Sequence, residues 1–313
     1  MTSYLDLLAI ILPIFSLFAI GLGARRLGWM STEAEPSYLK LVINLFYPCL
    51  VFRSVLDNPA LRNPSLLLSA PALGFTSIVL GLLVGYLAGR ALGMTVGTGL
   101  RTFSFSVGVY NYGYIPIALI DALWGRQTLG VLLVFNTGIE LALWTVGILT
   151  LSGLSLKEGW RRLANPVVCS LVAGVALNML GVTLPAVLLK VISLLAACAI
   201  PLGLMSAGAA LEPYVRRPAD LFEPRVSFGG PLLRYGLIPI GFLVCAKWLP
   251  VTGELRRVLI VQAAMPAGMF PLVLARHYGG QPIVAARNII ATTLVGIVLI
   301  PLWLHFGLSW AWH

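Results

Sequence analysis

Long apolar stretches separated by short polar segments follow one another from one end of the chain to the other. Most stretches hold about 20 residues, the length that an α-helix needs to cross the hydrocarbon core of a bilayer. The pattern therefore predicts ten membrane-spanning helices, numbered as spans 1 to 10. Their expected bounds are residues 5–23, 38–56, 66–89, 102–120, 128–151, 166–180, 187–211, 231–249, 255–275 and 283–306.

Two of these spans are interrupted near the middle. Residues 109–116 of span 4 read VYNYGYIP, and residues 265–271 of span 9 read MPAGMFP. Asparagine, glycine and proline disrupt helical pairing, and an unpaired backbone group at that depth costs several kcal/mol unless protein or a water-filled cavity surrounds it. Interrupted helices at matching places in two halves of a chain indicate the binding site of a secondary transporter. We therefore expect spans 4 and 9 to cross at their breaks and line a site.

The positions of the prolines indicate an internal repeat. Three pairs fall at equivalent places in spans 1 and 6, 2 and 7, and 4 and 9, with separations of 153, 153 and 155 residues: Pro13 and Pro166, Pro48 and Pro201, Pro116 and Pro271. Each half has an odd number of spans, so the second half enters the membrane from the opposite side. The expected fold is an all-α integral membrane protein of two inverted five-helix repeats, residues 1–151 and 166–313, joined by a cytoplasmic linker at 152–165. The longest loop is expected at 212–230, which is rich in proline and arginine.

The composition agrees with a membrane protein. Hydrophobic residues make up 59% of the 313 residues and charged residues only 10%, with a mean hydropathy of +0.94, whereas soluble domains have about 25% charged residues. The net charge of +10 is also typical of a nucleic-acid partner, but the basic residues are scattered among the loops. If the N-terminus is outside, 14 of the 21 Lys and Arg residues lie at cytoplasmic ends of spans, as the positive-inside rule requires. We expect a cell-membrane protein with both termini outside and no nucleic-acid partner.

Motifs of catalysis and metal binding are missing from the sequence. The four cysteines have no CxxC spacing, and the three histidines form no ligand pattern. The chain has no HExxH, no GxSxG and no phosphate-binding GxxxxGK[ST] motif of the kind that drives transport with ATP. We expect no enzymatic activity, no catalytic residue, no metal site and no cofactor other than H⁺ or Na⁺ as a coupling ion.

Four passages resemble the auxin efflux carrier family, whose bacterial members are often labelled malate or malonate permeases. They are NLFYP at 44–48, NYGYIP at 111–116, AIPLGLMSAGAAL at 199–211, and the stretch at 265–275. The likeness covers the whole chain, including the number of spans. It implies a ten-span carrier with crossed broken helices, related in fold to bile acid sodium symporters. It also implies organic-anion substrates and, in many members, a homodimer.

One position departs from the family pattern. The family commonly has an asparagine in the break of span 9, within a pattern like Pro-x-x-x-Asn-x-Phe. When residues 272–275 are aligned, that place is taken by Phe270. Asn111 therefore matches the family, whereas its expected partner does not. We hypothesise that a site with one amide and an added aromatic ring favours a bulkier or more hydrophobic anion.

The candidate substrate site consists of residues in the two breaks. Asn111 carries an amide that can donate to a carboxylate, and half-helix N-termini nearby add partial positive charge. The alternative is an asparagine that satisfies only its own broken turn. The prolines make the breaks, and the glycines give either close backbone approach or ordinary helix packing. The full set is Asn111, Tyr112, Gly113, Tyr114, Pro116, Pro266, Gly268, Phe270 and Pro271.

Glu140, near the middle of span 5, is the sharpest chemical signal in the sequence. An ionisable side chain at that depth costs at least ~2.5 kcal/mol on insertion scales, which makes it a functional candidate by default. It is expected to hold a proton or to help coordinate Na⁺; the alternative is a structural carboxyl bonded to Asn136 or to another span. Gln262 and Asn44, each about one turn before a break or a proline, are further candidates for ion coupling.

Together these features predict a secondary active transporter of a small organic anion that works by alternating access. The substrate is expected at the crossing of spans 4 and 9. The alternative is a transporter-like receptor, or a channel without coupled transport. An intramembrane enzyme is disfavoured, because Glu140 alone does not supply both an acid and a base.

Overall fold

The computed structural model of the chain describes residues 3–152 and 165–312. In these residues the regular structure is helical, apart from one isolated β-bridge. Seven rods of helix in the described residues are long and apolar enough to cross a membrane, and α9 (Pro166–Leu180) is a shorter apolar helix. Three of the seven lie at the two ends and in the first half of the chain, and each is a single element: α1 (Tyr4–Arg26), α4 (Pro64–Ala91) and α16 (Pro282–Trp312).

The other four long rods are α10 (Ala186–Val215) and three rods that contain a π-helical turn. These three are α2 (Ala34–Leu41) with η1 (Val42–Phe46) and α3 (Tyr47–Val55), α6 (Tyr114–Ala142) with η3 (Leu143–Gly147) and α7 (Ile148–Ser152), and α12 (Pro224–Leu232) with η4 (Leu233–Leu237) and α13 (Ile238–Trp248). Two π-helical turns lie just before a proline. The backbone N–H of Tyr47 donates to Val42 and that of Ile238 to Leu233, five residues back in each case. Because a proline ring clashes with the carbonyl four residues back, Pro48 and Pro239 account for this wider turn.

Spans 4 and 9 are both divided, as the sequence predicts. Residues 109–113 separate α5 (Leu100–Gly108) from α6, and residues 264–269 separate α14 (Gly253–Ala263) from α15 (Phe270–His277). The sequence predicts a loop at residues 121–127 between spans 4 and 5, but α6 continues through these residues. Gly125 alone leaves the helical conformation there, at φ 67° and ψ −163°, and a residue without a Cβ takes up that kink at no steric cost.

The prediction of a long loop at 212–230 is wrong. Helix α10 continues to Val215, α11 covers Pro218–Leu221, and α12 begins at Pro224. Pro213 lies inside α10, whereas Pro218 and Pro224 start helices, because the first turn of a helix has no use for the N–H that proline lacks. The Glu223 side chain accepts a hydrogen bond from the backbone N–H of Val226 and caps α12. The predicted cytoplasmic linker at 152–165 falls almost entirely outside the described residues.

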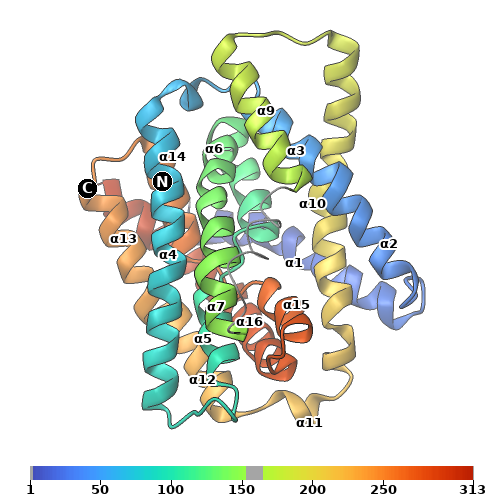
Figure 1. Cartoon of the computed structure of the whole chain (residues 1–313), viewed down its shortest axis with the longest axis vertical. Coiled ribbons are helices and arrows are strands. Elements are labelled where there is room, and N and C mark those ends of the chain that lie inside the picture. The colour runs from blue at the N-terminus through green and yellow to red at the C-terminus, as the bar shows by residue number, and fades with distance from the viewer. Residues whose placement is uncertain (1–2, 153–164, 313) are drawn as a thin grey trace.

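The helices form two bundles that do not coincide with the two halves of the sequence (Figure 1). In the first bundle, α1 packs along α10, and α3 packs on both α9 and α10. In the second, α4 packs on α5 and α6, α13 on α14, and α12 on α16. Each bundle therefore takes helices from both halves of the chain. The bundles meet mainly where α1 lies against α16 and where α3 and α10 lie against α6.

Close backbone contact holds the second bundle together behind the first break. A Cβ built on Gly108 of α5 would lie 2.6 Å from the backbone nitrogen of Leu82 and 2.8 Å from the carbonyl carbon of Gly81 on α4. Small residues allow membrane helices to approach this closely, and van der Waals packing is then the main source of association. The N-terminal half of span 4 is thus fixed against α4.

Candidate functional site

The two breaks cross as short antiparallel extended segments. Tyr110 and Ala267 form the isolated antiparallel β-bridge of the structure. The backbone N–H of Asn111 donates to the carbonyl of Pro266 at 2.7 Å, and that of Gly268 donates to the carbonyl of Val109 at 2.9 Å. Each break therefore satisfies backbone groups that the other leaves without helical partners, which is what a break buried at membrane depth requires.

Glycine and proline in the breaks have the shaping roles expected of them. A Cβ on Gly268 would lie 2.6 Å from the carbonyl oxygen of Tyr110, so only glycine allows the two segments to touch here. Pro116 and Pro271 lie in the first turns of α6 and α15, where no backbone N–H is needed. The carbonyl of Pro266 takes part in the crossing directly.

Four helix ends converge on this crossing. Helices α5 and α14 end there, and α6 and α15 begin there. Helix C-termini carry partial negative charge and N-termini partial positive charge, equivalent to roughly half an elementary charge each. The crossing therefore offers one pair of ends suited to a cation and another suited to an anion, without using any side chain.

Asn111 lies two residues before the N-cap of α6, Gly113, and keeps its amide nitrogen available. Its side-chain oxygen accepts from the backbone N–H of Ile115 at 3.4 Å, a long bond within the broken turn. Among the described residues no group accepts from its Nδ2 atom. The side-chain oxygen of Asn111 thus has the local role within the broken turn that was the alternative expectation. Its Nδ2 atom is left as a hydrogen-bond donor for a ligand.

Aromatic side chains of the breaks contact both bundles. The ring of Tyr112 stacks on Phe270 with centroids 5.8 Å apart and planes 18° apart, so Phe270 of the second break lies beside the first break. Tyr114 meets Tyr47 of α3 edge to face at 6.3 Å. Its ring also packs on Gly203 of α10, where a Cβ would lie 2.4 Å away. Residues of the first break thus face the first bundle across the interface.

Glu140 is bonded directly to the first break. The hydroxyl of Tyr112 donates to its Oε1 at 2.6 Å, and the indole N–H of Trp144 donates to its Oε2 at 2.8 Å. The alternative bond to Asn136 is not formed: the Asn136 amide donates to the backbone carbonyl of Tyr112 at 2.8 Å instead. Glu140, Asn136 and Tyr112 line a small cavity of ≈ 40 Å³ between α6 and the first-bundle helices α3 and α9. The carboxyl therefore lies at the interface of the two bundles.

The other two ion-coupling candidates lie in different surroundings. Gln262, fully buried at the end of α14, donates to the side-chain oxygen of Asn136 at 3.4 Å, and so joins the network behind Tyr112. Its own Oε1 has no hydrogen-bond partner among the described residues. Asn44 is exposed in η1, which packs chiefly on α10 and the neighbouring parts of its own rod. The geometry does not bring Asn44 to the crossing.

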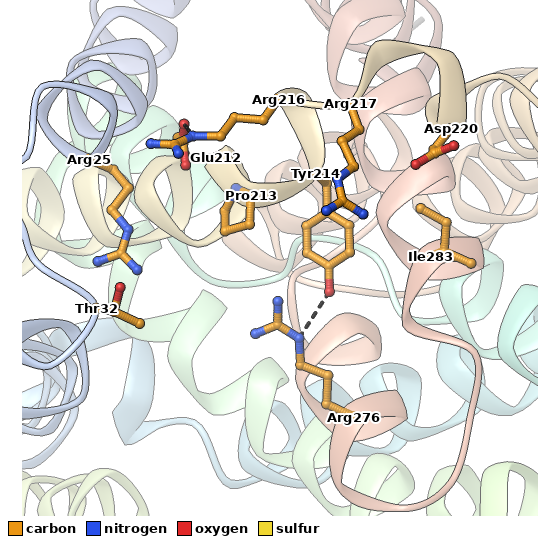
Figure 2. Close-up of a pocket in the computed structure, with 10 residues that line it drawn as sticks. All are labelled: Arg25, Thr32, Glu212, Pro213, Tyr214, Arg216, Arg217, Asp220, Arg276 and Ile283. Atoms are coloured by element: carbon orange, nitrogen blue, oxygen red, sulfur yellow. Dashed lines mark hydrogen bonds and ion pairs between the residues drawn. The ribbon is translucent and has the colours of Figure 1, made fainter.

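A basic cavity of ≈ 580 Å³ opens at one end of the bundle interface (Figure 2). Its walls come from α1 and α10 of the first bundle and from α15, α11 and the start of α16. Figure 2 shows Arg276 and Arg217 directed toward Tyr214, and Arg276 donates to the hydroxyl of Tyr214 at 2.9 Å. The charged residues that line the cavity are four arginines and two carboxylates: Arg25, Arg216, Arg217, Arg276, Glu212 and Asp220. All four arginines are among those that the sequence assigns to cytoplasmic ends.

Helix α15 connects this cavity to the crossing. Phe270 begins the helix beside Tyr112, and Arg276 lies six residues later in the cavity wall, about 9 Å along the helix axis. Phe270 and Val273 are 36% and 47% exposed, and Arg276 is exposed as well, so one face of α15 is open along this length. The spacing of three residues places them on the same side. An open apolar stripe thus leads from the basic cavity to the stacked rings.

Arg234 is a functional candidate that the sequence reasoning missed. Its side chain is fully buried, although the predicted start of span 8 at residue 231 placed it at the membrane surface. The helix begins ten residues earlier than Arg234, at Pro224, so Arg234 lies well inside the rod. The succession of Glu223 and Pro224, a capping side chain followed by a helix-starting proline, is the signal that would have corrected the boundary.

Comparisons with known proteins point to one family. The profile of a family described as "Membrane transport protein" matches residues 7–158 and 150–304. An "Uncharacterized transporter" of Methanothermobacter thermautotrophicus is 25% identical over 94% of this chain and 96% of its own length. A "Putative malonate transporter" of Rhizobium meliloti is 24% identical over 94% of both chains. "Auxin efflux carrier component 1" of Arabidopsis thaliana is 28% identical over 44% of this chain and 23% of its own length.

Proposed function

This chain belongs to the membrane transport protein family, and on that premise we propose that it is a secondary active transporter of a small organic anion. The resemblance to auxin efflux carriers is confirmed by the relatives of that name. The observation that carries the proposal is the mutual hydrogen bonding of two helix breaks at the crossing. Secondary transporters bind substrates where discontinuous helices expose backbone groups near the bilayer midplane.

We place the substrate carboxylate at the N-terminal ends of α6 and α15. The Nδ2 of Asn111 and the positive ends of the two half-helices favour an anion there. The apolar part of the substrate would lie against the stacked rings of Tyr112 and Phe270. The relative named for malonate suggests a small carboxylate, and the added ring of Phe270 favours one with a larger apolar part.

The ten crossings form two inverted repeats in this proposal. Seven long rods, the short helix α9 and the two divided spans add up to ten crossings. In this count the part of α6 before Gly125 belongs to the divided span 4, and the part after Gly125 belongs to a long rod of its own. The mixed membership of the two bundles supports the symmetry, since the first takes spans 1, 2, 6 and 7 and the second takes the remaining six. Alternating access then corresponds to movement of the second bundle, which carries the crossing, along the first. The termini outside and the homodimer stay predictions.

Glu140 makes proton coupling the better of the coupling alternatives. A substrate carboxylate at the N-terminal end of α6 would come close to the Glu140 carboxyl, because Tyr112, just before that end, contacts Glu140 directly. Two negative charges about 6 Å apart repel by about 3 kcal/mol at an effective dielectric constant of about 20. A proton on Glu140 removes that repulsion, so substrate and proton would bind together. Among the described residues no ion pair neutralises Glu140 in place of the proton.

Counterflow in proteoliposomes tests the proposal against the receptor and the channel. Vesicles loaded with unlabelled malonate or an aromatic monocarboxylate are diluted into labelled substrate. A carrier gives a saturable transient accumulation, whereas a channel gives only equilibration and a receptor gives no flux. We expect Asn111→Ser to reduce initial rates at least about tenfold, the effect of losing one hydrogen bond to a charged group.

The matched control for that variant is Asn63→Ser, which removes the same amide at the surface. Asn63 caps α4 by accepting from the backbone N–H of Ser65, a role that serine fulfils equally well. Its transport should equal that of the wild type. Absence of counterflow for every carboxylate tested, or full activity of Asn111→Ser, would reject this function and this site respectively.

A further inference from the structure

Arg234 places a permanent positive charge against the crossing. Its Nε and Nη2 atoms donate to the backbone carbonyl of Met265 at 3.1 and 2.6 Å. The guanidinium carbon lies 5.0 Å from the centroid of the Tyr110 ring, over its face. Met265 lies two residues past the end of α14, and Tyr110 belongs to the other break. One buried side chain thus contacts both broken spans.

The contacts of Arg234 differ from those of a structural ion pair. The ion pairs found in the described part of the chain are Arg25 with Glu35 and Arg216 with Glu212, so no described carboxylate pairs with Arg234. Its Nη1 atom is buried and has no hydrogen-bond partner there. Buried arginines are normally paired with a carboxylate. Within the described residues, the groups in contact with the charge of Arg234 are the Met265 carbonyl and the Tyr110 ring, close to the ends of two helices.

The partners of Arg234 are the groups that attract a cation. Helices α5 and α14 both end at the crossing, and their C-termini carry partial negative charge. In secondary transporters, unwound carbonyls and the C-terminal ends of half-helices are the ligands of the coupling Na⁺ or H⁺. The Met265 carbonyl is such a group, and the guanidinium of Arg234 already occupies it. The π-helical turn η4, which Pro239 produces, carries Arg234.

We propose that the guanidinium of Arg234 is a tethered cation that takes the place of a coupling Na⁺ at the crossing. The negative helix ends are neutralised by a charge that never leaves, and no Na⁺ binds at the Met265 carbonyl during the transport cycle. This inference rests on the proposed transport function, because a coupling Na⁺ has a role only in a transporter. Coupling, where present, is left to Glu140, which bonds Tyr112 of the first break.

Thermal unfolding of the purified full chain in detergent tests the inference without any transport assay. The Tm is measured in NaCl, KCl and choline chloride at equal ionic strength. For the wild type we expect the same Tm in all three salts. For Arg234→Ala we expect a lower Tm in choline chloride and a Na⁺-specific recovery of several degrees, because Na⁺ then binds the vacated carbonyl and stabilises the folded state by mass action.

Two further variants separate this role from a general loss of packing. Arg234→Lys keeps the charge, so its Tm should not depend on Na⁺. Arg287→Ala removes a half-buried arginine of α16 that donates to the backbone carbonyl of Asp220, and it should gain no Na⁺ response. If Arg234→Ala does not fold, Arg234→Ser is measured in its place. If neither variant folds, the dependence of the wild-type Tm on Na⁺ decides the inference.

A Na⁺-specific rise in the wild-type Tm would overturn the inference, as would a folded Arg234→Ala protein that is indifferent to Na⁺. Counterflow in Na⁺-free buffer keeps the two proposals distinguishable. Carboxylate transport that requires Na⁺ would reject the tethered cation and leave the carrier intact. A chain that transports no carboxylate in any salt would reject the carrier, while the Na⁺ response of the Arg234 variants would still report on the cation site.

Discussion

The hydroxyl of Tyr112 donates to the carboxylate of Glu140 at 2.6 Å, and this bond joins the first helix break to the interface of the two bundles. The same Tyr112 ring stacks on Phe270 of the second break. A change in the protonation of Glu140 therefore acts on a ring that also covers the proposed substrate. In the proposed mechanism, binding of the anion and titration of the carboxyl would be linked through this one side chain.

Glu140→Gln is expected to remove the pH dependence of transport. In the wild type, uptake should rise as the pH falls, because protonation removes the repulsion between Glu140 and a substrate carboxylate. Glutamine is permanently neutral and its side-chain oxygen still accepts from Tyr112, so the initial rate should vary little with pH. Initial rates in proteoliposomes from pH 5 to 8 measure this. An unchanged pH profile in the variant would show that coupling does not involve Glu140.

Phe270→Asn is expected to change the order of substrate preference. The substitution removes the ring that stacks on Tyr112 and introduces an amide, which the resemblance leads us to expect at this position. Loss of an aromatic contact costs about 0.5–1.5 kcal/mol beyond the buried area, so aromatic carboxylates should lose roughly threefold to tenfold in affinity. Small dicarboxylates should gain from the added amide. Competition by both classes against one labelled substrate measures the ranking, and an identical ranking in the two proteins would contradict the hypothesis.

Gly108→Ala is expected to destabilise the second bundle. The added methyl group would lie 2.6 to 2.9 Å from backbone atoms of α4, which cannot move aside as a flexible side chain would. Overpacking of this kind costs about 1–3 kcal/mol. Gly241→Ala is the matched control, because it lies in α13 with no atom within 4 Å of the new methyl group. There the better helix propensity of alanine should leave the Tm equal or slightly higher. Equal Tm values for the two variants would show that the α4–α5 contact is not tight.

The sequence pattern was enough to place the two helix interruptions. Both breaks lie where proline, glycine and asparagine gather, because these residues act locally and no packing partner is needed to recognise them. Composition predicts a loop at 212–230, whereas the stretch is largely helical. A proline that begins a helix cannot be told from one that ends a helix by composition alone. That error moved the start of span 8 and placed Arg234 at the surface.

Contacts between spans were beyond the reach of the sequence. Glu140 stood out as a charge inside an apolar stretch, but its bond to Tyr112 depends on how α6 folds back beside the first break. Asn136, the nearer residue along the helix, instead serves the backbone of Tyr112. The basic cavity of Figure 2 combines residues from positions 25, 217 and 276, which no pattern along the chain connects.

Arg217→Gln is expected to weaken the attraction of anions to the basic cavity. Arg217 is exposed, points into the cavity in Figure 2, and lies at the end of the open stripe on α15 that leads to Phe270. A charge about 10 Å from a substrate contributes about 0.7 kcal/mol at an effective dielectric constant of about 50, so KM should rise roughly threefold for a monoanion and tenfold for a dianion.

The ionic strength separates this electrostatic effect from a structural one. Screening at 0.5 M salt shortens the Debye length to about 4 Å, so the KM values of the variant and the wild type should converge. Arg62→Gln removes the same charge from the exposed η2 turn (Pro59–Arg62), which the predicted topology places on the other side of the membrane, and should leave KM unchanged. A KM increase that persists at high salt, or that is equal for monoanions and dianions, would mean that Arg217 acts through packing and that the cavity does not collect anions by their charge.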